Sequence, residues 1–122
     1  MSPETPEFDT GLCMQDLDPE RPRAILTPWG TMALFVIGDE VSALQAFCPH
    51  LEAPLFQGSV ANGAVTCPWH RWRFDLRSGA CLGRGEGRPP AREDDLARSE
   101  VRRSSRGTLV LARPHKPVRR LA

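Results

Sequence analysis

Two short segments, each with one cysteine and one histidine, constrain this chain more than any other feature of its sequence. The first is Cys48-Pro49-His50, and the second is Cys67-Pro68-Trp69-His70. Sixteen residues, 51–66, separate them. Each segment offers one thiolate and one imidazole within a tight turn, and the proline after the cysteine stiffens that turn. If the two turns face each other, two sulfur and two nitrogen ligands meet at one metal centre, from Cys48, His50, Cys67 and His70.

Two kinds of metal centre accept two cysteines and two histidines. A structural zinc site usually groups its two cysteines in one turn and its two histidines in another, whereas each turn of this chain mixes the two residue types. In a Rieske [2Fe–2S] cluster, two cysteines bind one iron and two histidines bind the other. The residues favour the iron–sulfur cluster, and they leave open a zinc site or a chance grouping.

Around these segments the chain resembles the Rieske-type ferredoxins and Rieske domains, in their low-potential soluble branch. The family pattern is C-x-H followed, after a spacer like the one seen here, by C-x-x-H. The branch typically continues as C-P-H-x-G-A-P-L and C-P-W-H-G-W-x-F-D-x-x-T-G, and this chain reads CPHLEAPLFQGSVANGAVTCPWHRWRFDLRSGACLG from Cys48 to Gly83. A weaker likeness extends over residues 8–112.

The resemblance implies one [2Fe–2S] cluster per chain. Cys48 and Cys67 would bind the inner iron, and His50 and His70 would bind the outer, more solvent-facing iron. It also implies the Rieske-like fold, in which small antiparallel sheets carry a subdomain of cluster-binding loops. High-potential members carry an extra cysteine in each loop, where this chain has Ala53 and Trp69, so we expect a low potential.

Two positions depart from the family pattern. Glu52 and Arg71 stand where the branch usually has glycine. If either glycine serves a backbone with positive φ, a residue with a Cβ strains the loop at that position.

Turn residues divide the rest of the chain into short elements. Twelve prolines and ten glycines fall at fairly regular intervals, and no window shows the 3.6-residue period of an amphipathic helix. We therefore expect an all-β fold. The expected strands cover 23–26, 31–37, 41–47, 60–66 as a hairpin around Asn62-Gly63, 72–76, 96–103 and 108–112, with an irregular loop over 83–95.

Length and charge bound the class of protein. A chain of 122 residues has room for one core but not for two. We expect a disordered leader over 1–7, a single domain over 8–113 and a basic tail over 114–122. The net charge is +1, whereas a nucleic-acid-binding domain usually has a clear basic excess. No nucleic-acid partner is therefore expected.

Hydropathy argues against a membrane protein. The longest purely apolar run, Met32–Ile37, has six residues, and a membrane-spanning helix needs about 20. The N-terminus is acidic and rich in proline, unlike a secretory signal. We expect a cytoplasmic protein whose cysteines stay reduced.

The remaining histidine limits the catalytic possibilities. A mononuclear iron site needs two histidines and a carboxylate, and only His115 lies outside the two segments. We therefore expect no enzyme but a monomeric one-electron carrier, a Rieske ferredoxin that passes electrons from a ferredoxin reductase to a terminal oxygenase. The alternatives are an electron-transfer small subunit of a larger reductase, such as nitrite reductase, and a zinc-bearing binding module.

Overall fold

The computed structural model describes residues 6–49, 53–69, 71–85, 89–90 and 94–118. Within these ranges the chain forms strands and two short 3-10 helices. In chain order the elements are β1 (Glu7–Cys13), η1 (Met14–Asp16), β2 (Arg23–Thr27), β3 (Gly30–Ile37), β4 (Glu40–Gln45), η2 (Leu55–Gln57), β5 (Ser59–Ala61), β6 (Ala64–Thr66), β7 (Arg73–Asp75), β8 (Cys81–Gly83), β9 (Arg98–Ser99), β10 (Val101–Arg103) and β11 (Thr108–Ala112).

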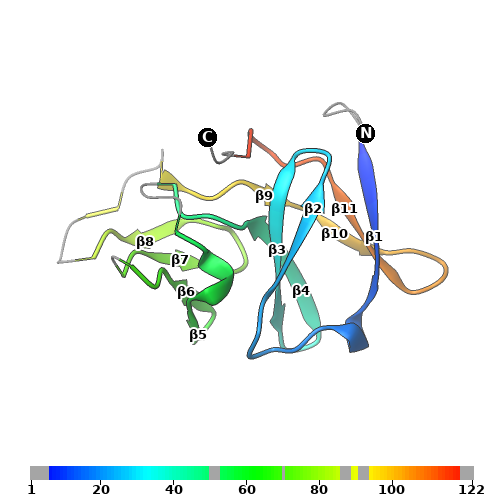
Figure 1. Cartoon of the computed structure of the whole chain (residues 1–122), viewed down its shortest axis with the longest axis horizontal. Coiled ribbons are helices and arrows are strands. Elements are labelled where there is room, and N and C mark those ends of the chain that lie inside the picture. Colours follow the sequence, from blue (N-terminus) through cyan, green and yellow to red (C-terminus); the bar gives the residue numbers. More distant parts are fainter. Residues whose placement is uncertain (1–5, 50–52, 70, 86–88, 91–93, 119–122) are drawn as a thin grey trace.

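The strands form three small sheets, ordered β1-β11-β10, β2-β3-β4-β9 and β5-β6-β7-β8. Within each sheet, neighbouring strands pair antiparallel. Figure 1 shows the β5–β8 sheet standing to one side of the other two sheets. We call residues 46–83, which hold this sheet, the small lobe, and we call the other two sheets the base. The expected all-β class of small antiparallel sheets is confirmed.

Turn chemistry explains two of the predicted hairpins. Between β3 and β4 the chain turns at Gly38, whose φ is +62°, and Ile37 pairs with Glu40. Between β5 and β6 it turns at Asn62 and Gly63, whose φ values are +52° and +75°. Asparagine and glycine tolerate these positive values better than other residues, as a type I′ turn requires.

The prediction of one continuous strand over 96–103 is wrong. The structure divides this stretch into β9, which pairs with β4, and β10, which pairs with β11. Glu100 lies between the two strands, and its carbonyl accepts a hydrogen bond from the Ala112 N–H at 2.9 Å. The chain therefore crosses from one base sheet to the other at a single residue.

The first strand, β1, is absent from the sequence prediction. Its sequence, EFDTGLC, is acidic at its start, and none of its residues is fully buried. Long-range pairing with β11 holds it, together with a double hydrogen bond from Arg102 to Glu7 at 2.8 Å. The Arg102 guanidinium holds the pKa of Glu7 below its usual range.

Strand β3 is buried on both faces and separates two apolar cores. Its residues Ala33 and Phe35 belong to one core, while Met32 and Leu34 belong to the other. Successive side chains of a strand point to opposite faces, so one apolar run serves both cores. The shared core lies between small lobe and base and comprises Ala33, Phe35, Leu44, Ala46, Cys48, Ala53, Leu55, Val65, Cys67, Trp72, Phe74, Leu76, Cys81 and Leu96. The base core comprises Trp29, Met32, Leu34, Ala43, Ala97, Leu109, Leu111 and Val118.

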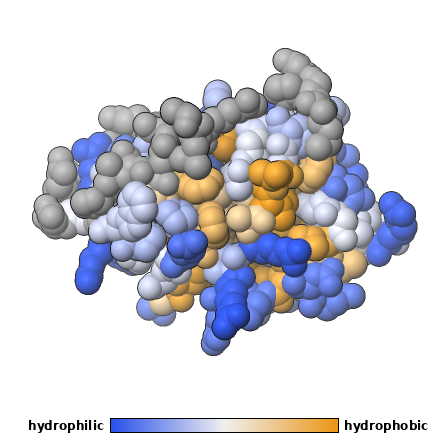
Figure 2. Space-filling model, viewed as in Figure 1, coloured by the Kyte–Doolittle hydropathy of each residue, from blue (hydrophilic) through white to orange (hydrophobic). Residues whose placement is uncertain are grey.

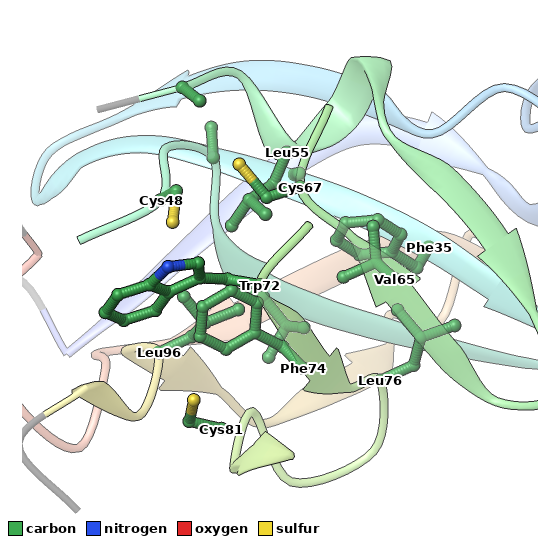
Figure 3. Close-up of a cluster of buried hydrophobic side chains, with 14 residues drawn as sticks. Phe35, Cys48, Leu55, Val65, Cys67, Trp72, Phe74, Leu76, Cys81 and Leu96 are labelled. Atoms are coloured by element: carbon green, nitrogen blue, oxygen red, sulfur yellow. The ribbon is translucent and has the colours of Figure 1, made fainter. Parts of the chain in front are cut away.

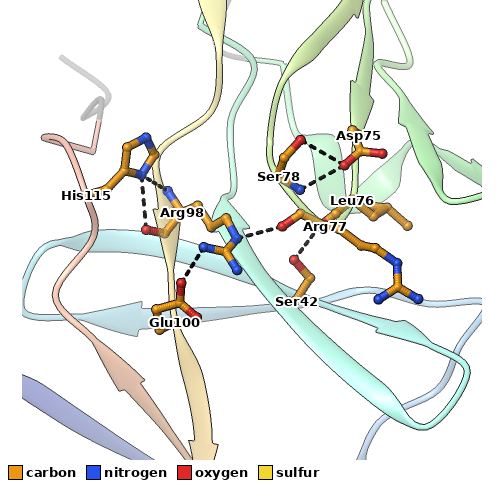
Figure 4. Close-up of polar contacts among 8 residues, drawn as sticks. All are labelled: Ser42, Asp75, Leu76, Arg77, Ser78, Arg98, Glu100 and His115. Atoms are coloured by element: carbon orange, nitrogen blue, oxygen red, sulfur yellow. Dashed lines mark hydrogen bonds and ion pairs between the residues drawn. The ribbon is translucent and has the colours of Figure 1, made fainter.

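Polar contacts also join the small lobe to the base, as Figure 4 shows. The Ser42 hydroxyl donates to the Leu76 carbonyl, and Arg98 Nε donates to the Arg77 carbonyl at 2.6 Å. Both carbonyls lie in the turn after β7. The turn is thereby fixed to the base at two successive residues.

The surface of the described residues is of ordinary composition for a folded domain. Figure 2 shows apolar residues over the middle of one face and hydrophilic residues around its lower rim. The exposed large apolar side chains are Leu26, Trp69 and Leu82. No helix among the described residues is long and apolar enough to span a membrane.

Candidate metal centre

Two loops of the small lobe start at the two predicted cysteine ligands and are closed in the same way. The Cys48 N–H donates to the Ala53 carbonyl, and the Cys67 N–H donates to the Trp72 carbonyl, both at 2.7 Å. Each loop therefore runs from a cysteine to the fifth residue after it. The first loop is framed further by the Leu55 N–H, which donates to the Ala46 carbonyl at 2.8 Å. The second loop joins β6 to β7.

The structure brings the two cysteines into the shared core. Cys48 is 0% exposed and Cys67 is 1% exposed. In Figure 3 both sulfur atoms lie on the same side of the Trp72 ring, while the Cys81 sulfur lies on the opposite side. Cys13 is on β1, in the base. The predicted pair therefore lies on one side of Trp72, with each cysteine at the start of one of the two loops.

The chemistry of these two side chains fits a metal centre. A thiolate surrounded by apolar side chains is costly unless a positive charge compensates it. Leu55, Ala53 and Trp72 supply such apolar surroundings in the shared core. A bound metal ion would provide the compensating charge, and main-chain bonds close both loops without it.

The predicted histidine ligands lie outside the described residues. This holds for His50 and His70, and also for Glu52. Among the described residues, no three histidine, cysteine or acidic side chains are grouped to hold a metal ion. His115 lies in the base, where its Nδ1 accepts a hydrogen bond from the Arg98 N–H at 3.1 Å. The assignment of His50 and His70 stays a prediction.

Arg71, near the end of the second loop, has the positive φ that favours the glycine usual at this position of the family pattern. Its φ is +59°, in the left-handed region that costs an L-residue about 1 kcal/mol or more. Its N–H donates to the Cys67 carbonyl at 3.2 Å. This second closure bond tightens the loop between Cys67 and Arg71. The strain predicted at this departure from the family pattern is therefore present.

A glycine that sequence reasoning missed also shapes the site. Gly58 ends η2, which follows the first loop. A Cβ on Gly58 would lie 2.2 Å from the Thr66 carbonyl oxygen, at the residue before Cys67. Only glycine allows the backbone after the first loop to approach the start of the second so closely. Its sequence neighbourhood gives no signal of this contact.

The turn after β7 is stabilised by an acidic side chain. Burial by itself would raise the pKa of Asp75. Hydrogen bonds from the Ser78 N–H and hydroxyl, each at 2.8 Å, together with the Arg77 charge, nevertheless hold that pKa below its usual value. The carboxylate thus stays ionised and fixes the turn that leads to β8.

Comparison with known families decides what kind of centre this is. The family model described as the Rieske [2Fe-2S] domain matches residues 13–97. The chain belongs to the Rieske [2Fe–2S] domain family. The cofactor of this family is a [2Fe–2S] cluster, and one binds per chain.

Proteins similar to this chain include the ferredoxin subunit of a dioxygenase. The anthranilate 1,2-dioxygenase ferredoxin subunit of Burkholderia cepacia is 39% identical over 61 residues, which cover 50% of this chain and 56% of the subunit. The chain thus matches about half the length of this curated relative.

Solved structures share the fold. The ferredoxin of carbazole 1,9a-dioxygenase from Nocardioides aromaticivorans IC177 superposes with a TM-score of 0.73 at 24% identity, covering 88% of this chain and 98% of that one. A Mycobacterium tuberculosis protein assigned as an NADH-dependent nitrite reductase small subunit gives a TM-score of 0.70 at 24% identity, covering 88% and 94%. The Rieske-like fold predicted from sequence is confirmed.

Proposed function

We propose that the protein is a one-electron carrier, a Rieske ferredoxin that takes electrons from a ferredoxin reductase and passes them to a terminal oxygenase. Cys48 and Cys67 would bind one iron of a [2Fe–2S] cluster, and His50 and His70 would bind the other. The observation that supports the proposal is the pair of equally closed loops, each of which starts at a buried cysteine of the shared core. When bound, the cluster stores and releases one electron per cycle.

The surroundings of the two cysteines suit a neutral cluster. Two Fe³⁺, two sulfides and two thiolates sum to zero charge, because neutral imidazoles add none. A neutral group can be buried among Leu55, Val65 and Phe74 without the desolvation cost that a dianion would meet. The same side chains keep water from the sulfur atoms, since Leu55, Val65 and Phe74 are each 0% exposed.

An exposed surface beside the second loop would receive the protein partner. Trp69 is 59% exposed, and Arg71 and Arg73 are also exposed. Aromatic and arginine side chains are enriched where proteins dock. An acidic patch on the oxygenase or on the reductase would complement the two arginines.

The number of histidines in the sequence favours a carrier over an enzyme. The chain has three histidines, and His115 alone is left for further chemistry once the cluster has its ligands. We infer that the protein acts as a cytoplasmic monomer which supplies electrons to a catalytic partner. Relatives that are ferredoxin subunits of dioxygenases favour this role.

A second role is supported by the structural neighbour assigned as a nitrite reductase small subunit. In that role the chain would bind one large subunit stably and would not travel between two partners. Size-exclusion chromatography with the product of the neighbouring gene separates the two roles. A carrier elutes alone, and a subunit elutes with its partner.

The cluster itself is tested on the full chain after anaerobic purification. We expect red-brown protein with two irons and two sulfides per chain and a rhombic EPR signal after reduction. The reduced protein should return to its oxidised absorption spectrum when an oxygenase and oxygen are added. Colourless protein with one zinc per chain would overturn the proposal.

A further inference from the structure

Arg84 lies over the face of Trp72, at the edge of the shared core. Its Cζ is 5.6 Å from the centre of the ring, a distance typical of a cation–π contact. Trp72 is 8% exposed and shares the core with Cys48 and Cys67. Its carbonyl also closes the second loop. Arg84 therefore brings a positive charge to Trp72, the residue whose carbonyl closes the Cys67 loop.

Asp94 holds this guanidinium in place. Its Oδ2 lies 2.6 Å from Arg84 Nη2 and 2.7 Å from Arg84 Nε. The two side chains are only 26% and 14% exposed. By contrast, Arg77 and Glu40 form an ion pair with exposures of 60% and 61%. Charges shielded from water are screened less than exposed ones, so the Arg84–Asp94 pair acts more strongly on its neighbours.

The backbone beside Asp94 is anchored as well. Asp95 Oδ1 accepts a hydrogen bond from the Cys81 N–H at 2.7 Å, and Leu96 is fully buried in the shared core. Arg84 follows β8 directly. Both partners of the pair are thus attached to fixed elements on the Trp72 side of the small lobe.

We propose that the Arg84–Asp94 pair tunes the reduction potential of the centre through its two opposite charges, the Arg84 guanidinium over Trp72 and the Asp94 carboxylate bound to that guanidinium. This inference rests on the proposed function, since it needs a cluster at Cys48 and Cys67. Reduction adds one negative charge to the centre. A nearby cation favours the reduced state, and a nearby anion disfavours it. Arg84 therefore raises the potential and Asp94 lowers it.

Because the two charges are opposite, their removal should shift the midpoint potential in opposite directions. In the full-length, cluster-loaded protein, Arg84→Gln should shift the midpoint potential downward and Asp94→Asn should shift it upward. The double variant should lie between the two single variants. Arg84→Lys keeps the positive charge and should stay close to the wild type. Potentials are measured by voltammetry at one pH and one low ionic strength.

The exposed pair supplies the matched controls. Arg77→Gln and Glu40→Gln remove one charge each and should leave the potential closer to the wild type than the Arg84 and Asp94 variants do. A merely structural pair would shift the potential in the same direction for both Arg84→Gln and Asp94→Asn, because both would admit water to Trp72. That result, or no shift in either variant, overturns the inference. Wild-type protein that binds no cluster would overturn the proposed function instead.

Discussion

The base and the small lobe are both antiparallel β structures, but they are stabilised in different ways. In the base, β3 and β4 pair over six residues from each strand, and β3 is buried on both faces. In the small lobe, all four strands have three residues each. Ladders this short are marginal without support. The small lobe therefore depends on the shared core and on closure of its two loops, whereas the base provides a scaffold.

The largest effect is expected from the cysteine ligands. Cys67→Ser should abolish the visible spectrum of the cluster and destabilise the small lobe, because binding energy at such a centre is also folding energy. Hydrogen exchange should show lost protection in β5–β8 and retained protection in β3 and β4.

Cys81→Ser is the matched control, since Cys81 is also buried in the shared core. The Cys81→Ser variant should keep the visible spectrum of the cluster. A red Cys67→Ser variant with an unchanged EPR signal would contradict both the ligand assignment and the dependence of the lobe on it.

Two large side chains of β3, Phe35 and Met32, belong to different cores. Phe35→Ala should cost about 3–5 kcal/mol of unfolding free energy and Met32→Ala about 2–5 kcal/mol, because both are fully buried and leave cavities. The two variants should differ in how fast they lose the cluster. Phe35→Ala should speed its loss on dilution, since Phe35 packs in the shared core, and Met32→Ala should speed it less. Equal rates of loss, followed by absorbance, would mean that the two cores do not act separately.

The contact at Gly58 links η2 to the start of the second loop. Gly58→Ala should destabilise the small lobe by roughly 1–3 kcal/mol, as overpacking does, because its Cβ would overlap the Thr66 carbonyl. Gly83→Ala places a methyl group in open space and should change the stability little. Urea denaturation of both variants measures the effect. An unchanged midpoint for Gly58→Ala would show that the backbone relaxes at this contact.

The smallest effect is expected at Arg71. Arg71→Gly should raise the free energy of unfolding by about 0.5–1 kcal/mol, since relief of the left-handed backbone outweighs the greater freedom of glycine in the unfolded chain. Arg73→Gly removes an exposed arginine from β7, where φ is ordinary, and should lower stability. Thermal melts of the loaded protein would check the sign. A loss of stability in both variants would mean that the arginine side chain itself stabilises the loop.

The turns and the two cysteine segments were predictable because their signals are local. Asn62-Gly63 determines a turn by its own backbone preferences. The two segments that begin at Cys48 and Cys67 each contain one cysteine and one histidine, which indicates a metal centre directly. Strand β1 was not predictable, because its partner β11 lies about 100 residues away and pairing depends on that context more than on propensity. The Arg84–Asp94 pair was missed for the same reason. Residues 83–95 show no periodicity, and nothing local relates them to Trp72.

Closure of the two loops uses main-chain atoms alone. The donors are the Cys48 and Cys67 amides, and the acceptors are the Ala53 and Trp72 carbonyls. Substitutions between these ends, other than proline, leave every closing atom in place. Residues between these ends, apart from the proposed ligands His50 and His70, can therefore change to suit a new redox partner without loss of the closing bonds. Glu52 and Arg71, which depart from the family pattern, are two such positions in the sequence, and at Arg71 the change carries the cost of a left-handed backbone.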